Sequence, residues 1–167
     1  MTEQSGFVLI SNWGKPQANN KFMNNIISDA GGGYEIDAKN FISTMAFDYN
    51  LYYNSVRTNK WRWNNVDYTT FSGWKTASGQ DAHGVNGNPL FMNAGAWDFH
   101  LKSASPAINA GGFLTSTVGS GTNSKTMVVS DPYWFTDGYG LDTGDVIQLT
   151  GQTASAVITA INYNNGP

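Results

Sequence analysis

Residues 22–27 read FMNNII, and residues 47–52, which lie 25 positions later, read FDYNLY. Each stretch begins with Phe, carries Asn at its fourth position and ends in two large apolar or aromatic residues. A looser match joins residues 6–10 to residues 33–37, at an offset of 27. Repeats of this length are typical of solenoids, in which short strands joined by turns stack coil upon coil.

Asn25 and Asn50 provide a specific test of this periodicity. If strands one period apart are neighbours, the two side chains lie about 4.8 Å apart and hydrogen-bond as a ladder. Asn also tolerates the backbone conformations that turns between strands require. The alternative is that the two residues occupy unrelated turns.

A series of motifs further along the chain resembles a known family. In chain order they are FDYNLYYN at 47–54, the aromatic residues Trp63, Tyr68, Phe71 and Trp74, GQDAHG at 79–84, NPLF at 88–91, DFHL at 98–101 and SPAINAG at 105–111. With them, residues 6–113 resemble the end of bacterial right-handed parallel β-helix proteins, which are pectate-lyase-like. The resemblance implies an all-β fold: the last coils of a right-handed parallel β-helix, a capping segment with a short helix, and then a small antiparallel β module. It also implies an extracellular or cell-surface location.

The domain boundaries follow from composition. Residues 1–113 are expected to form the terminal coils and their cap, with a strand at 61–63 and a helix near 68–77 that covers the unpaired strand edge. Residues 114–126 are rich in Thr, Ser and Gly, which predicts a linker or a long loop. Residues 127–167 are expected to form the small β module, with its last strand missing.

Both ends of the chain are abrupt. Residues 1–6 contain neither the basic region nor the apolar region of a signal peptide. An apolar stretch begins at once at residue 7, and a predicted strand at 157–161 is followed only by a turn-like tail. We therefore expect a segment of a longer parent chain.

Composition excludes several classes of partner. The 167 residues include only 13% charged residues but 19 Asn and 19 Gly, and the net charge is −3. Such a chain lacks the basic surface that nucleic-acid binding requires, so no nucleic-acid partner is expected. No apolar run reaches 18 residues, so no membrane span is expected. The chain has no Cys, which excludes disulfides and thiolate chemistry.

The charged residues bear on polysaccharide lyase chemistry, which needs a base and a cation that neutralises the uronate carboxylate. Lys39 and Arg57 are the candidates for catalytic residues, because Lys, Arg or His often serves as the base, and Glu35 with Asp37 are the candidates for calcium ligands on one strand face. The alternative is that these four residues are scattered charges on a solvent face. Because no nucleophile or converging base accompanies them, we expect no catalytic residue and no required cofactor in this chain.

Three further sets of polar residues have ordinary structural interpretations. Asp81 and His83 are separated by one residue, which suggests acid–base chemistry. The preferred interpretation is that both residues hydrogen-bond to backbone groups of loops in the cap. His100 is expected to be an exposed strand residue, with Phe99 and Leu101 facing inward. Aspartates 137, 142 and 145 are expected to cap their own turns and not to bind calcium.

Exposed aromatic rings are candidates for sugar stacking. The candidate carbohydrate-binding residues are Tyr53, Trp61 and Trp13; Tyr52 and Trp97 also flank polar turn residues. Strand alternation sends one of Tyr52 and Tyr53 inward and the other outward. Tyr53 is expected outside, because its equivalent one period earlier is the polar Ser28, whereas that of Tyr52 is Ile27. The alternative for each ring is that it fills the core.

Three functions follow from these observations. The first is a non-catalytic C-terminal part of an extracellular, carbohydrate-associated β-helix protein, with a polysaccharide as its partner. The second is a fragment of a polysaccharide lyase or glycoside hydrolase whose catalytic coils lie upstream. The third is a structural, adhesin or tail-fibre segment. Fold resemblance does not choose among them.

Overall fold

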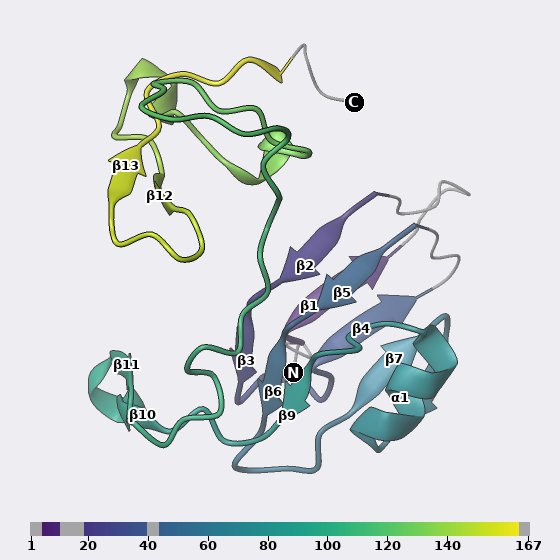
Figure 1. The fold of residues 1–167 in the computed structure, drawn as a ribbon. Coiled ribbons are helices and arrows are strands. Elements are labelled where there is room, and N and C mark those ends of the chain that lie inside the picture. Colours follow the sequence, from purple (N-terminus) through teal and green to yellow (C-terminus); the bar gives the residue numbers. More distant parts are fainter. Residues whose placement is uncertain (1–4, 11–18, 40–43, 164–167) are drawn as a thin grey trace. The chain divides into compact units, whose positions relative to one another are not determined.

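The computed structural model describes residues 5–10, 19–39 and 44–163. The chain divides into two compact units, Met1–Gly112 and Phe113–Pro167, which are described separately below. In the part of the chain that the structure describes, the fold is mainly β with one α-helix (Figure 1). No helix among these residues is long and apolar enough to cross a membrane.

The first unit contains three small sheets built on parallel strands. Their orders are β1-β4-β7-β8, β2-β5 and β3-β6-β9, and only the β7–β8 pair is antiparallel. The strands are β1 (Phe7–Ile10), β2 (Lys21–Met23), β3 (Ile26–Ser28), β4 (Ile36–Lys39), β5 (Ala46–Asp48), β6 (Leu51–Tyr53), β7 (Trp61–Trp63), β8 (Val66–Tyr68) and β9 (Val85–Asn86).

The predicted offset of 25 residues sets the register of these sheets. Phe22 is the partner of Phe47, and Ile27 is the partner of Tyr52. The next pair in the chain, Ile36 and Trp61, has the same offset. The looser match at residues 6–10 was wrong in detail, because Phe7 pairs with Ile36, 29 residues later.

The Asn ladder predicted between neighbouring strands is confirmed. The side-chain Nδ2 of Asn25 donates to Oδ1 of Asn50 at 3.0 Å, and the Asn25 backbone N–H donates to the same oxygen at 3.1 Å. Asn50 makes the equivalent bonds one step further, to the carboxylate of Asp81, both at 3.1 Å. The ladder therefore ends on a buried carboxyl group.

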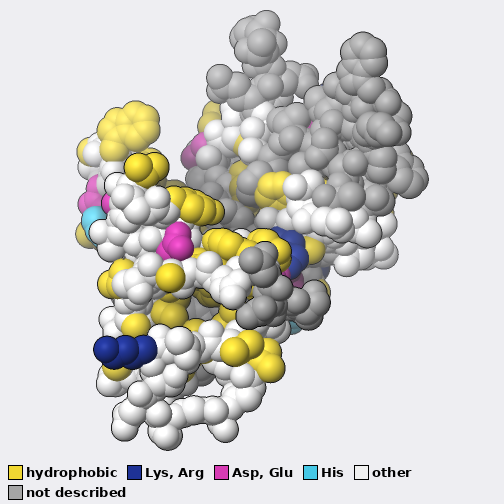
Figure 2. Space-filling model, turned by 90° about the horizontal axis from the view of Figure 1, so that it is seen from above, with side chains coloured by type: hydrophobic (Ala, Val, Ile, Leu, Met, Phe, Trp, Pro, Cys, Tyr) yellow, Lys and Arg dark blue, Asp and Glu magenta, His cyan; other side chains and the backbone are white. Residues whose placement is uncertain are grey.

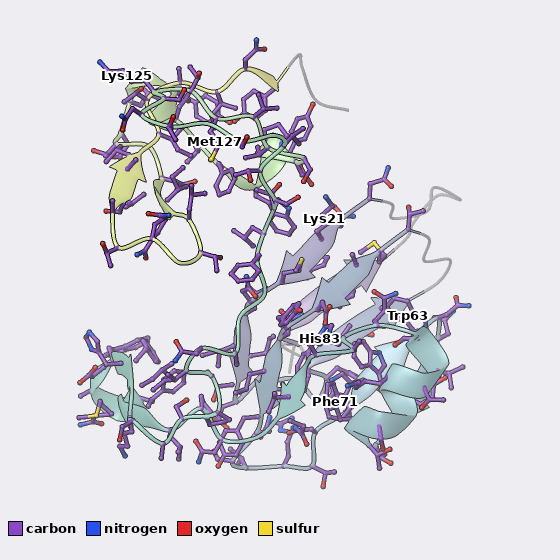
Figure 3. The ribbon with its side chains drawn as sticks, in the orientation of Figure 1. Lys21, Trp63, Phe71, His83, Lys125 and Met127 are labelled. Carbon is purple, nitrogen blue, oxygen red and sulfur yellow. The ribbon has the colours of Figure 1, made fainter. Side chains whose placement is uncertain are left out.

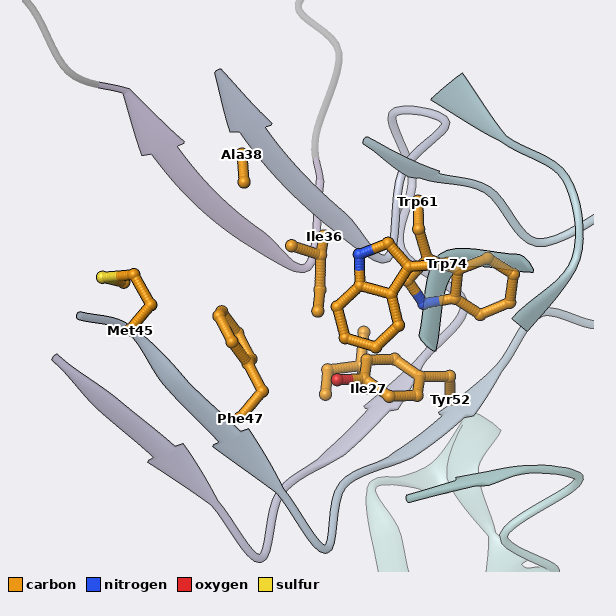
Figure 4. Packing of buried hydrophobic residues seen from close by; sticks show 8 residues of the cluster. All are labelled: Ile27, Ile36, Ala38, Met45, Phe47, Tyr52, Trp61 and Trp74. Atoms are coloured by element: carbon orange, nitrogen blue, oxygen red, sulfur yellow. The ribbon is translucent and has the colours of Figure 1, made fainter. Parts of the chain in front are cut away.

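One core lies between these sheets and the helix (Figure 4). Phe47 stacks on Phe22, with 4.8 Å between the ring centroids. Side chains at these equivalent positions of neighbouring strands are therefore in direct contact. Trp61 and Trp74 are fully buried. The core cluster comprises Ile27, Ile36, Ala38, Met45, Phe47, Tyr52, Trp61 and Trp74.

Helix α1 (Phe71–Ser78) closes this core with Trp74. Its N-cap is Thr70, whose hydroxyl accepts from the Gly73 N–H at 3.2 Å, and Gly79 ends it with φ 67°. The sequence predicted a helix from about residue 68. It starts later because β8 folds back on β7 as an antiparallel hairpin, which uses residues 66–68 as strand.

A second hairpin follows in the same unit. Strands β10 (Phe91–Asn93) and β11 (Asp98–Leu101) are antiparallel, and the 3₁₀ helix η1 (Ala94–Ala96) joins them. The expectation that Phe99 points inward was wrong, because 51% of this residue is exposed.

The second unit is built on a short antiparallel pair, β12 (Val146–Gln148) and β13 (Ser155–Val157), with 3₁₀ helices η2 (Pro132–Trp134) and η3 (Gly138–Gly140). Part of the predicted linker 114–126 belongs to this unit. Thr117 bridges Val129, and the Val118 N–H donates to the Val128 carbonyl at 2.8 Å. These residues are held by backbone pairing, which a free linker lacks.

The all-β class is consistent with this architecture, but the extended solenoid is not. The sheets of the described residues are small, two of them are antiparallel pairs, and no parallel run exceeds three strands. The hairpin β7–β8 interrupts parallel stacking because β8 occupies the edge at which a further parallel strand would pair. The predicted last coils of a pectate-lyase-like β-helix are therefore not what the structure forms.

Candidate functional site

A groove in the first unit brings together residues from three separate segments. It has a volume of about 590 Å³ and lies where the loop after β6, the start of α1 and the segment after β9 meet. Phe71, labelled in Figure 3, belongs to the helical wall of this groove. The lining residues are Tyr53, Asn54, Arg57, Thr58, Asn59, Trp61, Thr69, Thr70, Phe71, Ser72, Asn86, Gly87 and Asn88.

The chemistry of this lining is almost entirely amide and hydroxyl. Four Asn residues and several residues with hydroxyl groups line the same space. Arg57 is the only charged residue of the lining, and it is exposed. Neutral donors and acceptors around one positive charge suit a polar ligand that carries a negative group.

The loop that carries Arg57 is held by its own side chains. Asn54 Oδ1 accepts from the backbone N–H groups of Val56 and Arg57, both at 3.1 Å. Asp29 accepts from the Ser55 N–H at 2.6 Å and from its hydroxyl at 2.7 Å. These bonds order the backbone before a ligand arrives, which lowers the entropic cost of binding.

The opposite wall is fixed in the same way. Asn86 Nδ2 donates to the Tyr52 carbonyl at 2.9 Å, and Asn88 Nδ2 donates to the Tyr53 hydroxyl at 3.1 Å. Asn88 Oδ1 also accepts from the Leu90 N–H at 2.8 Å. The half-buried ring of Tyr53 is therefore oriented at the edge of the groove.

The aromatic residues that are candidates for sugar stacking differ in their exposure. Tyr52 is fully buried and Tyr53 half-buried, in the order that alternation predicts. Trp61 was expected to offer a face for sugar stacking, but it has no exposed surface because β7 directs its ring into the core against Trp74. Trp13 lies outside the described residues.

Glu35 and Asp37, the candidates for calcium ligands, are both buried and serve different partners. Asp37 forms ion pairs with Lys39 at 3.1 Å and with Arg62 at 3.2 Å, so its charge is already balanced. Burial raises the pKa of Glu35 to about 7, against the smaller effect of a hydrogen bond from Asn54 at 3.4 Å. No group of three or more possible metal-binding side chains occurs within the described ranges.

Lys39 and Arg57, the candidates for catalytic residues, do not converge. Arg57 lines the groove, whereas Lys39 is not among its lining residues and is paired with Asp37. A base and a neutralising cation must face one substrate carbon to work together. These two residues therefore do not form that pair.

Asp81 and His83 also act separately. Asp81 is buried, and its carboxylate accepts from the Tyr52 hydroxyl at 2.5 Å as well as from Asn50. His83 instead lies 2.9 Å from Asp48 and stacks on the Tyr49 ring at 4.5 Å. The two residues thus satisfy polar groups of different segments, Asp81 at β6 and His83 at the end of β5.

The acidic residues of the second unit cap their own backbone. Asp137 accepts from the N–H groups of Tyr139 and Ile161, at 3.0 and 3.1 Å. Asp142 accepts from the Thr143 N–H at 2.7 Å, and Asp145 from the Thr136 N–H at 2.8 Å. This is the turn-capping role that the sequence predicted for them.

The amides of the groove were missed by sequence reasoning. The motif NPLF at 88–91 was assigned to the closing segment, but the overlapping run NGNP at 86–89 was not considered, although two Asn residues that flank Gly are a signal for an ordered polar turn. Nothing in the sequence places this run beside Asn54 and Asn59, because only the pairing of β9 with β6 does so.

Comparison with known proteins adds no relative. No protein-family model matches the sequence, and no curated protein and no solved structure matches it either. Together with the small mixed sheets, this result shows that the proposed membership in the pectate-lyase-like β-helix proteins was wrong. Function has to be argued from the groove itself.

Proposed function

We propose that the groove binds an acidic polysaccharide and does not cleave it. The observation that carries this proposal is Arg57, a single cation set among amide and hydroxyl groups. A guanidinium group pairs with a carboxylate through two parallel hydrogen bonds, and it does so with defined geometry. A uronic acid residue offers one carboxylate and several hydroxyl groups on the same ring.

The amides supply the remaining contacts. Each Asn side chain both donates and accepts, as a sugar hydroxyl does, so Asn59 and Asn86 match hydroxyl groups of either orientation. The ring edges of Tyr53 and Phe71 provide apolar contact for the C–H groups of a pyranose. The volume of about 590 Å³ is within the range of small-molecule sites.

The absence of cleavage is proposed because the groove lacks a base beside its cation. The lining residues contain no His, Lys, Asp or Glu. Glu35 lies behind Asn54 and is 1% exposed, so it does not reach a ligand. An extracellular or cell-surface location would follow from such a ligand and is part of the same proposal.

The finer fold is also a proposal. We infer that strands β2 to β7, within residues 19–39 and 44–63, form a short repeat with a period of 25 residues, which β8 and α1 close. The support is the shared offset of three strand pairs and the Asn25–Asn50–Asp81 ladder.

On the face shown in Figure 2, charged side chains are few and separated, so no continuous basic surface favours another polyanion there.

Affinity electrophoresis in gels containing pectate, alginate or neutral dextran tests the function. The protein should be retarded by at least one acidic polymer and not by dextran. Arg57→Gln should abolish the retardation, whereas Lys102→Gln, which removes an exposed charge outside the groove, should keep it. Equal loss in both variants would show that attraction is only general electrostatics, which salt screens. Formation of unsaturated product, with or without calcium, would contradict the absence of cleavage.

A further inference from the structure

The hairpin β10–β11 exposes aromatic surface that the groove does not use. Trp97 is 82% exposed at the end of the turn, and Phe99 is 51% exposed on the following strand. Five consecutive residues, Ala96, Trp97, Asp98, Phe99 and His100, line a shallow pocket that is open to solvent. Other large apolar residues of the described part of the chain are also exposed, but Trp97 and Phe99 are in contact and form a continuous aromatic surface.

The rings are held in place by one another and by the backbone. Trp97 packs edge-to-face on Phe99 at 6.2 Å, and Phe99 packs edge-to-face on Phe91 at 5.3 Å. Trp97 has φ 63°, a left-handed conformation that bulky residues rarely adopt, and its N–H donates to the Ala94 carbonyl at 3.1 Å. Glycine suits this backbone conformation better than a bulky residue does.

Two polar side chains stand beside this ring. His100 Nδ1 lies 2.5 Å from Asp98 Oδ1, and the His100 backbone N–H donates to the same oxygen at 3.1 Å. The second carboxylate oxygen of Asp98 and the Nε2 of His100 have no partner among the described residues. The pocket therefore combines an exposed ring, a fixed acceptor and an imidazole nitrogen.

We propose that this hairpin is a second sugar-binding site, for a neutral hexose with two adjacent hydroxyl groups. The C–H face of the sugar stacks on Trp97, and the free oxygen of Asp98 accepts from the hydroxyl groups. The carboxylate repels uronic acids, so the ligand class differs from that of the groove. This inference does not rest on the proposed function, because no residue of the groove takes part.

Isothermal titration of the full chain with hexasaccharides of glucose, mannose and galactose tests the site. At least one of them should bind, and Trp97→Gly should weaken that binding about tenfold or more, since a stacked ring is worth roughly that factor. Trp97→Gly suits the left-handed backbone, so the hairpin should keep its fold. Asp98→Asn should weaken neutral sugars and remove the discrimination against uronic acids.

Control variants distinguish sugar binding at this hairpin from sugar binding elsewhere and from self-association. Tyr133→Ala removes an exposed ring in the second unit and should leave binding unchanged. Arg57→Gln should also leave it unchanged, so failure at the groove and failure at the hairpin are distinguishable. No binding of any hexasaccharide at millimolar concentration would overturn the inference. Concentration-dependent dimerisation that Trp97→Gly abolishes, without sugar binding, would overturn it as well and assign the hairpin to self-association.

Discussion

Glu35 is a carboxyl group whose surroundings favour its neutral form. Burial raises its pKa to about 7, from 4.5 in the unfolded chain, so the folded state binds a proton more tightly in this range. The contribution of Glu35 to the free energy of unfolding is fully present below pH 4.5. It is lost as the pH rises through about 7, by up to about 3 kcal/mol.

Urea unfolding at pH 5 and pH 8 measures this effect. Asp81, whose pKa burial also raises, acts in the same direction. The hydrogen bond from Arg62 lowers the pKa of Asp67 from 3.8, so Asp67 affects stability only at pH values below this range. The comparison with Glu35→Gln removes only the contribution of Glu35. We expect the variant to lose less stability between the two pH values than the unmodified chain does. An equal loss in both proteins would contradict the assignment.

Asp81 and His83 differ in what they stabilise, although they are neighbours in sequence. Asp81→Ala would leave the buried Tyr52 hydroxyl and the Asn50 N–H without an acceptor, at a cost of about 3 kcal/mol. His83→Ala removes an exposed contact with Asp48 and should cost less than about 1 kcal/mol. Chemical denaturation of both variants checks this ordering, and equal effects would contradict it.

At the scale of elements, α1 holds the core closed through one side chain. Trp74 is fully buried, and its ring contacts include Phe47, Tyr52 and Trp61. Trp74→Ala should therefore lower the free energy of unfolding by about 3–5 kcal/mol. Thr76→Ala, an exposed change in the same helix, should alter it by no more than about 0.5 kcal/mol. Similar unfolding midpoints for the two variants would show that α1 does not close the core.

The elements also show how far a sequence can be interpreted. The 25-residue offset, the strand at 61–63 and the helix around Trp74 were predictable, because aromatic spacing and Asn repeats mark them. Strand β8 was not predicted, although the pair Asn64–Asn65 before it suits a tight hairpin turn. In the structure both residues have the positive φ that such turns require. The exposure of Phe99 was not predictable from alternation, because no residue of β10 or β11 is buried and the hairpin has no core face for alternation to mark.

At the scale of the whole molecule, the two units offer an internal control for each other. A Cβ at Gly144 would lie 2.1 Å from the Ile158 carbonyl oxygen, whereas one at Gly121 would meet nothing closer than 3.9 Å. Gly144→Ala should disrupt the second unit, and Gly121→Ala should not. The indole N–H signal of Trp134 should shift in the first variant, while those of Trp61, Trp63 and Trp74 stay in place. Shifts in both sets would show that the units fold as one.

The groove was only partly predictable, because contacts between distant parts of the sequence bring its residues together. Arg57 and Tyr53 were identified as single residues, because a cation and an outward ring are recognisable in isolation. The Asn residues that surround them come from positions 54 to 88, and strand pairing alone brings them together. Trp61 was misassigned since its burial depends on β4 and α1, which no local pattern around residue 61 encodes.

Mapping of amide signals during titration with an oligogalacturonate tests acidic polysaccharide binding by the groove most directly. We expect shifts of the side-chain amides of Asn54, Asn59, Asn86 and Asn88 and of the Arg57 guanidinium, with none at residues 113–163. In Arg57→Gln these shifts should disappear at the same ligand concentration. An unchanged spectrum of the unmodified protein, or shifts confined to surfaces away from the groove, would contradict the proposal.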